Sequence, residues 1–253
     1  MKDMRKTKII CTLGPAVDTP ELIAALLSGG MNAARFNFSH GSHPEHLERL
    51  NRLKAVRDSM GVPVATILDT KGPEIRIKTF EEKSITLEAG DTFTLTAEDI
   101  VGNQNKVAVT YPKLYEEVEA GQVILIDDGL VAIRAEQIKG QEIVCTVENG
   151  GTLSANKSIN IPGVHISLPA LTEKDIADIR FGVENDFDFI AASFVRRAAD
   201  VEAVRDVLHQ CGGDEVKIIA KIENQEGIDN IDDILAAADG IMVARGDLGV
   251  EIP

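Results

Sequence analysis

Residues 216–227 read VKIIAKIENQEG, an apolar run that ends in Lys221 and Glu223. Side chains two positions apart in a strand point to the same face, so the cation and the carboxylate would leave the strand together. Taken alone, such a pair is also typical of a solvated strand end, where an exposed ion pair contributes little to stability. The stretch therefore predicts a functional edge only if other strands end in the same way.

Composition places the chain among ordinary soluble globular proteins. The 253 residues are 44% hydrophobic and 26% charged, and the three cysteines show no C-x-x-C spacing, which argues against a disulfide framework and a zinc site. A formal net charge of −15 argues against broad binding to nucleic acid or to an anionic membrane. No stretch resembles a signal peptide, and none reaches the roughly 20 apolar residues that span a bilayer. We therefore expect a cytoplasmic protein that binds neither nucleic acid nor membrane.

Strand-like and helix-like stretches alternate in the two outer parts of the chain. Residues 1–70 and 169–253 contain short apolar runs followed by amphipathic stretches, the pattern of parallel βα units. In residues 71–168 the helical periodicity is lost, and short strands are separated by turn pairs. The pattern predicts a discontinuous α/β domain with an all-β domain inserted after its third strand. Helices are expected at 19–30, 43–61, 173–187, 198–213 and 225–240.

Capping residues mark two of the expected helix N-termini. Thr19 precedes Pro20, and Thr172 precedes the acidic Glu173 and Asp175, as expected of N-cap positions. We predict a structural role for these residues and no chemistry.

Six apolar runs end in polar residues. In a βα barrel the carboxyl ends of the strands form the reaction face, so polar residues there predict a functional site. In the second run Arg35, Asn37 and Ser39 share one face by period two, while Phe36 and Phe38 take the other face, which is expected to pack against helices. The six runs are IICT (9–12), AARFNFSH (33–40), ATILDT (65–70), FIAASF (189–194), IIAKIE (218–223) and IMVARGD (241–247).

The residues expected at this edge combine cations with oxygen ligands. Hard oxygen donors suit magnesium, which takes one or two protein carboxylates and completes its shell with water and phosphate oxygens. Arg and Lys nearby suit a phosphoryl group, where positioning and charge neutralisation provide most of the catalysis. The sequence predicts phosphoryl or carboxylate chemistry on a small anionic substrate. The residues are Arg35, Asn37, Ser39, Asp69, Arg76, Lys221, Glu223 and Asp247.

Seven strings, in order along the chain, resemble the pyruvate kinase family. They are TKIICTLGPA (7–16), MNAARFNFSHG (31–41), ILDTKGPEIR (67–76), IDDGL (126–130), AASFV (191–195), AKIENQEG (220–227) and GIMVARGDLGVEIP (240–253). The resemblance implies a (β/α)8 barrel of the TIM-barrel type, of which this chain would hold the first six βα units, with a β-barrel-like lid inserted after strand 3. It also implies phosphoryl transfer from phosphoenolpyruvate to ADP in glycolysis, giving pyruvate and ATP, with Mg2+ (or Mn2+) and K+ as cofactors.

The resemblance further implies roles for single residues. Lys221 matches the catalytic lysine that contacts the transferring phosphoryl group, and Arg35 matches an arginine on the substrate phosphate. The backbone of Gly246 and Asp247 resembles the site for the substrate carboxylate at a helix N-terminus, where N–H groups favour anions. The other matches are Glu223 and Asp247 to magnesium ligands, Asn37, Ser39, Asp69 and Thr70 to the potassium shell, and Arg76 and Lys157 to nucleotide-phosphate contacts. His40 is a further candidate for a phosphate contact, in place of a metal role.

Two departures from the family pattern leave alternatives open. The family commonly has Gly-Val-Asn where this chain has Ser158-Ile159-Asn160 after Lys157, which reduces backbone freedom there. The chain also stops at Pro253, before the last two strands of the family barrel. It could therefore be a non-catalytic folded fragment that binds metal or nucleotide without turnover. A different enzyme on a related phosphoenolpyruvate–pyruvate barrel is disfavoured by LDTKGPEIR. Because six strands would leave two unpaired edges, a homo-oligomer is expected.

Three histidines and two other features have simpler explanations. His40, His43 and His46 are spaced by three, as metal ligands can be, but they cross a junction between a strand and a helix, so a metal role is disfavoured. The DDG stretch at 127–129 is expected to form a turn in the inserted domain rather than a cation site, and Cys145 to be a packed thiol.

Overall fold

The computed structural model describes residues 6–252 of the chain. The chain divides into two compact units, and the predicted α/β fold is confirmed. The assignment of six βα units, the inserted lid and the predicted domain boundaries stay predictions. The first unit runs up to Gly72 and resumes at Pro169–Ile222 and Asn230–Met242, whereas the second contains Pro73–Leu168, Glu223–Asp229 and the residues from Val243 on.

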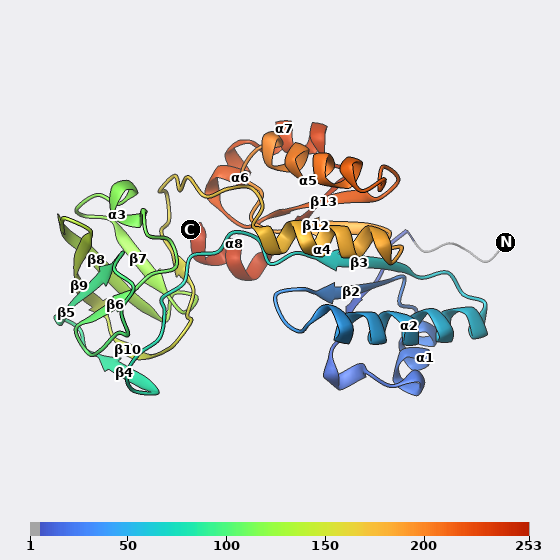
Figure 1. Ribbon diagram of the computed structural model, residues 1–253, viewed down its shortest axis with the longest axis horizontal. Helices are drawn as coiled ribbons and strands as arrows, with labels where there is room; N and C mark the ends of the chain where they lie inside the picture. The colour runs from blue at the N-terminus through green and yellow to red at the C-terminus, as the bar shows by residue number, and fades with distance from the viewer. Residues whose placement is uncertain (1–5, 253) are drawn as a thin grey trace. The chain divides into compact units, whose positions relative to one another are not determined.

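A six-stranded sheet forms the centre of the first unit (Figure 1). Its order is β1-β2-β3-β12-β13-β14, and the pairs from β1 to β13 are parallel. Asn37 lies opposite Asp69, and Ala191 lies opposite the same residue from the other side. The parallel order brings the carboxyl ends of these strands to one edge. The strands are Ile10–Thr12 (β1), Ala33–Asn37 (β2), Ala65–Asp69 (β3), Phe189–Ala192 (β12), Lys217–Ile222 (β13) and Gly240–Val243 (β14).

Helices lie alongside the strands of this sheet (Figure 1). The Thr19 side chain accepts a hydrogen bond from the Leu22 backbone at 3.4 Å, and the Thr172 side chain accepts one from the Asp175 backbone at 3.1 Å. Both predicted N-caps are therefore confirmed. The helices are Pro20–Gly29 (α1), His43–Met60 (α2), Glu173–Glu184 (α4), Ala198–Gln210 (α5) and Ile231–Ala237 (α7), with a short 3-10 turn at Pro15–Val17.

The single helix expected at 225–240 is wrong. The structure has two helices there, Gln225–Asp229 (α6) and Ile231–Ala237 (α7), separated at Asn230. The Asn230 side-chain amide donates to the backbone oxygen of Arg196 at 3.0 Å. This contact joins residues far apart in sequence, so the apolar periodicity of residues 225–240 gave no sign of it.

An aromatic cluster fills the space behind β2. Phe36 and Phe38 are 0% and 1% exposed, as the alternation in residues 33–40 predicts. The Phe36 ring lies edge-on to Phe187 at 5.2 Å between centroids, and the Phe38 ring lies 5.7 Å from Phe181. Since this face of the strand is buried in aromatic contacts, the opposite face carries Arg35 and Asn37 toward the polar edge.

The second unit has two sheets around its own core. One sheet has the order β11-β7-β8-β9-β5-β6, and the other sheet pairs β10 with β4. All strand pairs of the two sheets are antiparallel except β5 with β6, which is parallel. Cys145 is fully buried, and burial raises the pKa of its thiol to about 12, which fits the predicted packed thiol. The strands are Ser84–Leu87 (β4), Thr92–Thr96 (β5), Lys106–Ala108 (β6), Val123–Ile126 (β7), Val131–Lys139 (β8), Glu142–Asn149 (β9), Gly151–Ser154 (β10) and Ile159–Asn160 (β11), and the helices are Leu114–Glu117 (α3), α6 and Arg245–Glu251 (α8).

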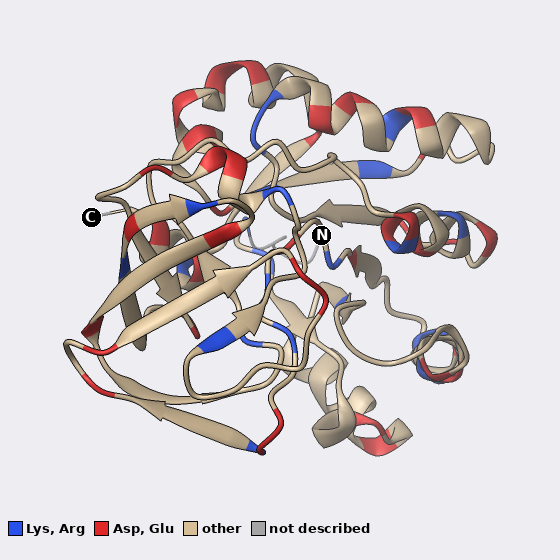
Figure 2. Ribbon diagram, turned by 60° about the vertical axis from the view of Figure 1, so that its left-hand side comes forward, with Lys and Arg blue, Asp and Glu red and all other residues tan. Residues whose placement is uncertain are grey.

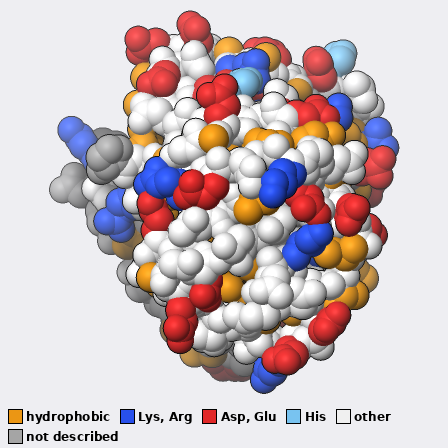
Figure 3. All heavy atoms as spheres, turned by 90° about the vertical axis from the view of Figure 1, so that its left-hand side faces the viewer, with side chains coloured by type: hydrophobic (Ala, Val, Ile, Leu, Met, Phe, Trp, Pro, Cys, Tyr) orange, Lys and Arg blue, Asp and Glu red, His pale blue; other side chains and the backbone are white. Residues whose placement is uncertain are grey.

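Charged side chains are spread over the structure. Asp and Glu occur on helices, strands and loops (Figure 2), in keeping with the net charge of −15. On the face drawn in Figure 3, Lys and Arg side chains are interspersed with Asp and Glu. Within residues 6–252, no helix combines the length and apolar character needed to cross a bilayer.

Candidate functional site

Asp69, at the end of β3, pairs with two cations from other strands of the same sheet. Its Oδ2 accepts a hydrogen bond from Arg35 Nε at 2.5 Å, and its Oδ1 accepts one from Lys221 Nζ at 3.1 Å. Arg35 lies on β2 and Lys221 on β13. Asp69 is 1% exposed and Lys221 is 9% exposed, so each charge depends on the other for compensation. The predicted meeting of Arg35, Asp69 and Lys221 is observed, with the carboxylate placed between the two cations.

Ser193 completes this cluster from the end of β12. Lys221 Nζ donates to Ser193 Oγ at 2.7 Å, and Ser193 Oγ lies 2.6 Å from the backbone oxygen of Thr70. A hydroxyl has one proton, so Ser193 donates that proton to the Thr70 carbonyl and accepts the hydrogen bond from Lys221 with an oxygen lone pair. The serine thereby links Lys221 to the Thr70 carbonyl.

Sequence reasoning missed Ser193 as a site residue. The signal was present, because the run FIAASF changes from apolar to polar at this serine. What the run could not show is that β12 lies directly between β3 and β13 in the sheet. That placement puts the Ser193 hydroxyl between groups carried by its two neighbours.

The turn after β2 carries the other candidates of the first unit. The Asn37 side-chain oxygen accepts from the Ser39 backbone at 3.0 Å, and the Phe38 backbone donates to the Asp69 backbone oxygen at 2.9 Å. Ser39 and His40 are exposed, whereas Thr70 is 1% exposed. The predicted potassium shell thus draws on two adjacent strand ends, β2 and β3.

The donors at these two strand ends are all oxygen atoms. Asn37, Ser39, Asp69 and the Thr70 carbonyl provide amide, hydroxyl, carboxylate and backbone oxygens, which are groups that can replace the hydration shell of a potassium ion. A carboxylate has about four lone-pair positions, so Asp69 keeps acceptor capacity beside its two cations. In the described part of the chain, no three His, Cys, Asp or Glu side chains gather as a metal-binding group. This donor set therefore fits a weakly held monovalent cation better than a transition metal.

Two predicted cations of the second unit are each paired with an acid. Lys157 Nζ lies 2.9 Å from Asp127 Oδ1, and Arg76 Nε donates to Glu74 Oε2 at 2.8 Å. Arg76 also donates to the Asn156 backbone oxygen. These pairs are partly exposed and therefore contribute little to stability.

The predicted carboxylate ligands differ in their exposure. Glu223 is 1% exposed, whereas Asp247 is exposed in the first turn of α8, next to Gly246. Near the end of α8, burial raises the pKa of the Glu251 carboxyl, whose Oε1 accepts from Asn160 Nδ2 at 2.8 Å. Asn160 belongs to the stretch that departs from the family pattern after Lys157.

The DDG stretch forms the predicted turn. Asp127, Asp128 and Gly129 have positive φ angles of 57°, 55° and 83°, and the Leu130 backbone donates to the Asp127 backbone oxygen at 3.0 Å. These residues connect β7 to β8. The turn presents the Asp127 carboxylate to Lys157, which is a contact between two residues far apart in sequence.

The rings of His43 and His46 have different hydrogen-bond partners. His43 Nε2 lies 2.7 Å from Asp178 Oδ1, and His46 Nε2 lies 2.8 Å from the His40 backbone oxygen. The His43 ring also stacks on Phe181, with 4.4 Å between centroids. That the spacing of three does not reflect a metal site stays a prediction.

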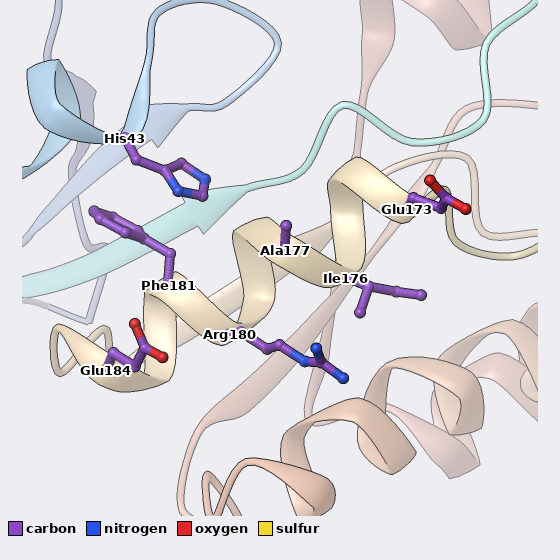
Figure 4. Close-up of a pocket in the computed structure, with 7 residues that line it drawn as sticks. All are labelled: His43, Glu173, Ile176, Ala177, Arg180, Phe181 and Glu184. Carbon is purple, nitrogen blue, oxygen red and sulfur yellow. The ribbon is translucent and has the colours of Figure 1, made fainter.

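One open pocket of about 410 Å3 lies along an outer face of α4 (Figure 4). Its charged lining has both signs, and Phe181 and His43 form part of its wall. None of the predicted site residues lines it, so we assign the pocket no part in the chemistry of the strand ends. The lining residues are His43, Glu173, Ile176, Ala177, Arg180, Phe181 and Glu184.

The parallel sheet and the charged cluster at its carboxyl edge define an α/β protein with a site suited to a small anion. The chain belongs to the pyruvate kinase family: residues 4–253 match the family model described as the barrel domain of pyruvate kinase. The resemblance seen in the sequence is thereby confirmed.

Several curated relatives are similar along nearly the whole chain. A pyruvate kinase of Clostridium acetobutylicum is 51% identical over 251 residues, which cover 99% of this chain and 53% of the relative. Pyruvate kinases of Geobacillus stearothermophilus and Bacillus licheniformis are 51% and 50% identical, with 98% and 99% of this chain covered and 43% of each relative. The chain spans about half the length of the curated relatives it matches.

Proposed function

We propose that the chain contributes a large part of the catalytic site for phosphoryl transfer from phosphoenolpyruvate to ADP, giving pyruvate and ATP. The observation that carries this proposal is the buried cluster in which Asp69, at the end of β3, bonds to Arg35 on β2 and to Lys221 on β13. Membership in the pyruvate kinase family supports the same reaction. The two cations suit a phosphoryl group, because its transfer depends mainly on positioning and charge stabilisation.

In this proposal Lys221 is the catalytic residue. Its ammonium is held at 3.1 Å from Asp69 and 2.7 Å from Ser193, so its position is set before substrate binds. A preorganised cation stabilises the charge that develops on the transferring group without reorganisation during the reaction. Arg35 binds the substrate phosphate from β2, and the backbone at Gly246 and Asp247 receives the substrate carboxylate.

Cation and nucleotide sites complete the proposal. Glu223 and Asp247 would hold Mg2+ (or Mn2+), and Asn37, Ser39, Asp69 and Thr70 would hold K+, through their oxygen atoms. These ions supply charge neutralisation and orientation for the phosphate groups when they are bound. Arg76, Lys157 and His40 would contact the phosphates of ADP or ATP.

The same proposal includes the molecular setting of the reaction. We infer a cytoplasmic homo-oligomer in which residues 1–70 and 169–253 form a barrel domain and residues 71–168 form a lid. The outer strands of the six-stranded sheet support the oligomer, because Ile10 on β1 is 47% exposed and Val243 on β14 is 56% exposed. Exposed apolar side chains on edge strands favour association with another chain.

A coupled assay for pyruvate tests the reaction, with Lys221→Met as the variant. Turnover should fall about a hundredfold, since loss of one group that stabilises the transition state costs on the order of 3 kcal/mol. Lys217→Met is the matched control, because Lys217 lies on the same strand with its side chain 51% exposed. Equal activities of the two variants would remove Lys221 from the mechanism.

Calorimetric titration with Mg2+ and ADP separates catalysis from binding alone. Binding together with pyruvate formation by this chain supports the enzyme proposal. Binding without any pyruvate formation supports the alternative, a folded fragment that binds metal or nucleotide without turnover.

A further inference from the structure

We propose that His46 is a positioning residue: its imidazole holds the turn that carries Ser39 and His40 in a fixed conformation. The role of that turn in cation and nucleotide binding rests on the proposed function. The positioning itself rests on contacts within the first unit and can be tested separately.

The turn between β2 and α2 is fixed at three points. At its start, the Asn37 side-chain oxygen accepts from the Ser39 backbone at 3.0 Å. At its end, the Ser42 backbone donates to Glu45 Oε2 at 2.6 Å, within the capping box of α2. The middle of the turn is held by His46, whose Nε2 lies 2.8 Å from the His40 backbone oxygen.

The contact defines the protonation of the imidazole. A backbone carbonyl only accepts hydrogen bonds, so His46 Nε2 must carry the proton. Nδ1 is buried and has no hydrogen-bond partner among the described residues. A neutral ring with its proton on Nε2 fits both observations, because a second proton on Nδ1 would be a buried donor without an acceptor.

The ring itself has little freedom to move. His46 is 3% exposed and stacks on Phe38 with 4.0 Å between centroids and an interplanar angle of 12°. Phe38 is 1% exposed and lies at the start of the turn. The ring of His46 therefore packs against one residue of the turn and bonds to the backbone of another.

Gly41 gives independent evidence that the backbone of the turn packs closely against the His46 ring. Its φ angle is +80°, which disfavours any side chain, and a Cβ added there would lie 3.3 Å from His46 Nε2. A side chain at this position would therefore require the imidazole or the turn to shift by a few tenths of an ångström.

The positioning role predicts a selective effect on binding. Ser39 and His40 depend on the turn, whereas Arg35 and Lys221 are held by Asp69. Loss of the His46 contact should therefore weaken potassium activation and ADP binding about tenfold, the effect of one lost hydrogen bond to a buried group. The KM for phosphoenolpyruvate should change by less than about threefold.

Two substitutions separate the hydrogen bond from the packing. His46→Phe keeps the ring stacked on Phe38 and removes the donor, whereas His46→Gln keeps a donor near the Nε2 position and removes the ring. Amide hydrogen exchange in residues 38–42 is measured on the full chain. We expect exchange there to be about tenfold faster in His46→Phe and near the original rate in His46→Gln. His209→Gln, at an exposed histidine at the end of α5, is the control.

Gly41→Ala provides a second route if His46→Phe does not fold. It should accelerate exchange in the same turn, because the new Cβ would displace the backbone from the imidazole. Unchanged exchange and unchanged potassium dependence in His46→Phe would overturn the proposal, as would equal losses in His46→Phe and His46→Gln. If the unsubstituted chain exchanges slowly in this turn but forms no pyruvate, the proposed function fails while the positioning role is retained.

Discussion

Asp69 is the residue on which the charge balance of the strand ends depends. Its buried carboxylate is shared between Arg35, whose side chain is 24% exposed, and Lys221, whose side chain is 11% exposed. Removal of the carboxylate should therefore destabilise the charged lysine more than the charged arginine, because water can reach the arginine more easily.

Asp69→Asn keeps the shape of the side chain and removes its charge. We expect the free energy of unfolding to fall by about 3 kcal/mol, because Lys221 remains buried beside a neutral amide. Urea denaturation measures this change. Asp186→Asn is the control, because Asp186 pairs with Lys54 while its side chain is 87% exposed, and it should cost less than about 0.5 kcal/mol. Similar losses in both variants would contradict the expectation.

Ser193→Ala removes the hydroxyl between Lys221 and the Thr70 carbonyl. We expect kcat for pyruvate formation to fall about tenfold with little change in KM, because the substitution frees the ammonium to leave its reactive position without removing its charge. Steady-state kinetics measures both parameters. Ser59→Ala breaks a comparable hydroxyl contact, with the Val56 backbone oxygen in α2, and should leave kcat unchanged. A normal kcat in Ser193→Ala would mean that the Ser193 hydroxyl is not needed to position the lysine.

Helix α2 contains a buried imidazole that responds to pH. Burial lowers the pKa of His46 from its usual value of 6.5, with Arg49 and Lys174 acting in the same direction and the bond to His40 and the charge of Asp178 opposing them. The folded state therefore binds this proton less readily than the unfolded state. The stabilisation is complete above pH 6.5 and is lost as the pH falls below that value toward the lower pKa of the folded state.

His46→Phe should flatten the pH dependence of stability. Between pH 7.5 and pH 5, the free energy of unfolding of the unsubstituted chain should fall more steeply than that of the variant. Urea denaturation at several pH values provides the comparison. The hydrogen bond to Asp214 raises the pKa of His209, so this histidine changes the pH dependence of stability in the opposite direction. Its contribution is the same in the unsubstituted chain and in the variant. Parallel curves would show that His46 does not titrate differently in the two states.

At the scale of elements, local chemistry allowed much of the fold to be predicted. Threonine caps, a proline at the first helical position and the alternation of Arg35, Phe36 and Asn37 each act within one helix or strand, so the sequence contains their cause. The family strings added the candidate residues at the strand ends.

Contacts between elements could not be predicted in the same way. The alternation along β3 and β13 indicates which face carries Asp69 and Lys221, but the atoms that meet are determined by strand order and register. The link through Ser193 and the helix break at Asn230 both arise from partners far away in sequence. The imidazole of His46 was likewise read only as one of three evenly spaced histidines.

At the scale of the whole molecule, the two outer strands of the six-stranded sheet carry exposed apolar side chains. Ile10 on β1 and Val243 on β14 are both more than one third exposed. We expect the chain to self-associate in a concentration-dependent manner, with a dimer as the first species, because closed twofold assemblies are the commonest. Light scattering coupled to size exclusion measures the mass.

Substitution of one edge residue should reduce this association. Val243→Lys places a charge on the edge strand and is expected to shift the population toward the monomer, since charged edge residues oppose strand pairing. Val101→Lys, at a 55% exposed valine outside the regular strands, is the matched control. A chain that remains monomeric at all concentrations would contradict the expected self-association of this chain.

Asp175 ties together two points where the chain passes between the units. Its Oδ1 accepts from the Gly72 backbone at 2.9 Å, while its Oδ2 accepts from the Thr172 backbone at 2.9 Å and from the Thr172 hydroxyl. One buried carboxylate thus bonds both to Gly72, where the chain leaves the first unit, and to Thr172, shortly after the chain returns to it. For protein engineering, these hydrogen bonds mark a place where the segment between Gly72 and Thr172 could be replaced by a shorter connector. The Asp175 carboxylate already holds the two ends of that segment together, and a shorter loop loses less conformational entropy when its ends are joined.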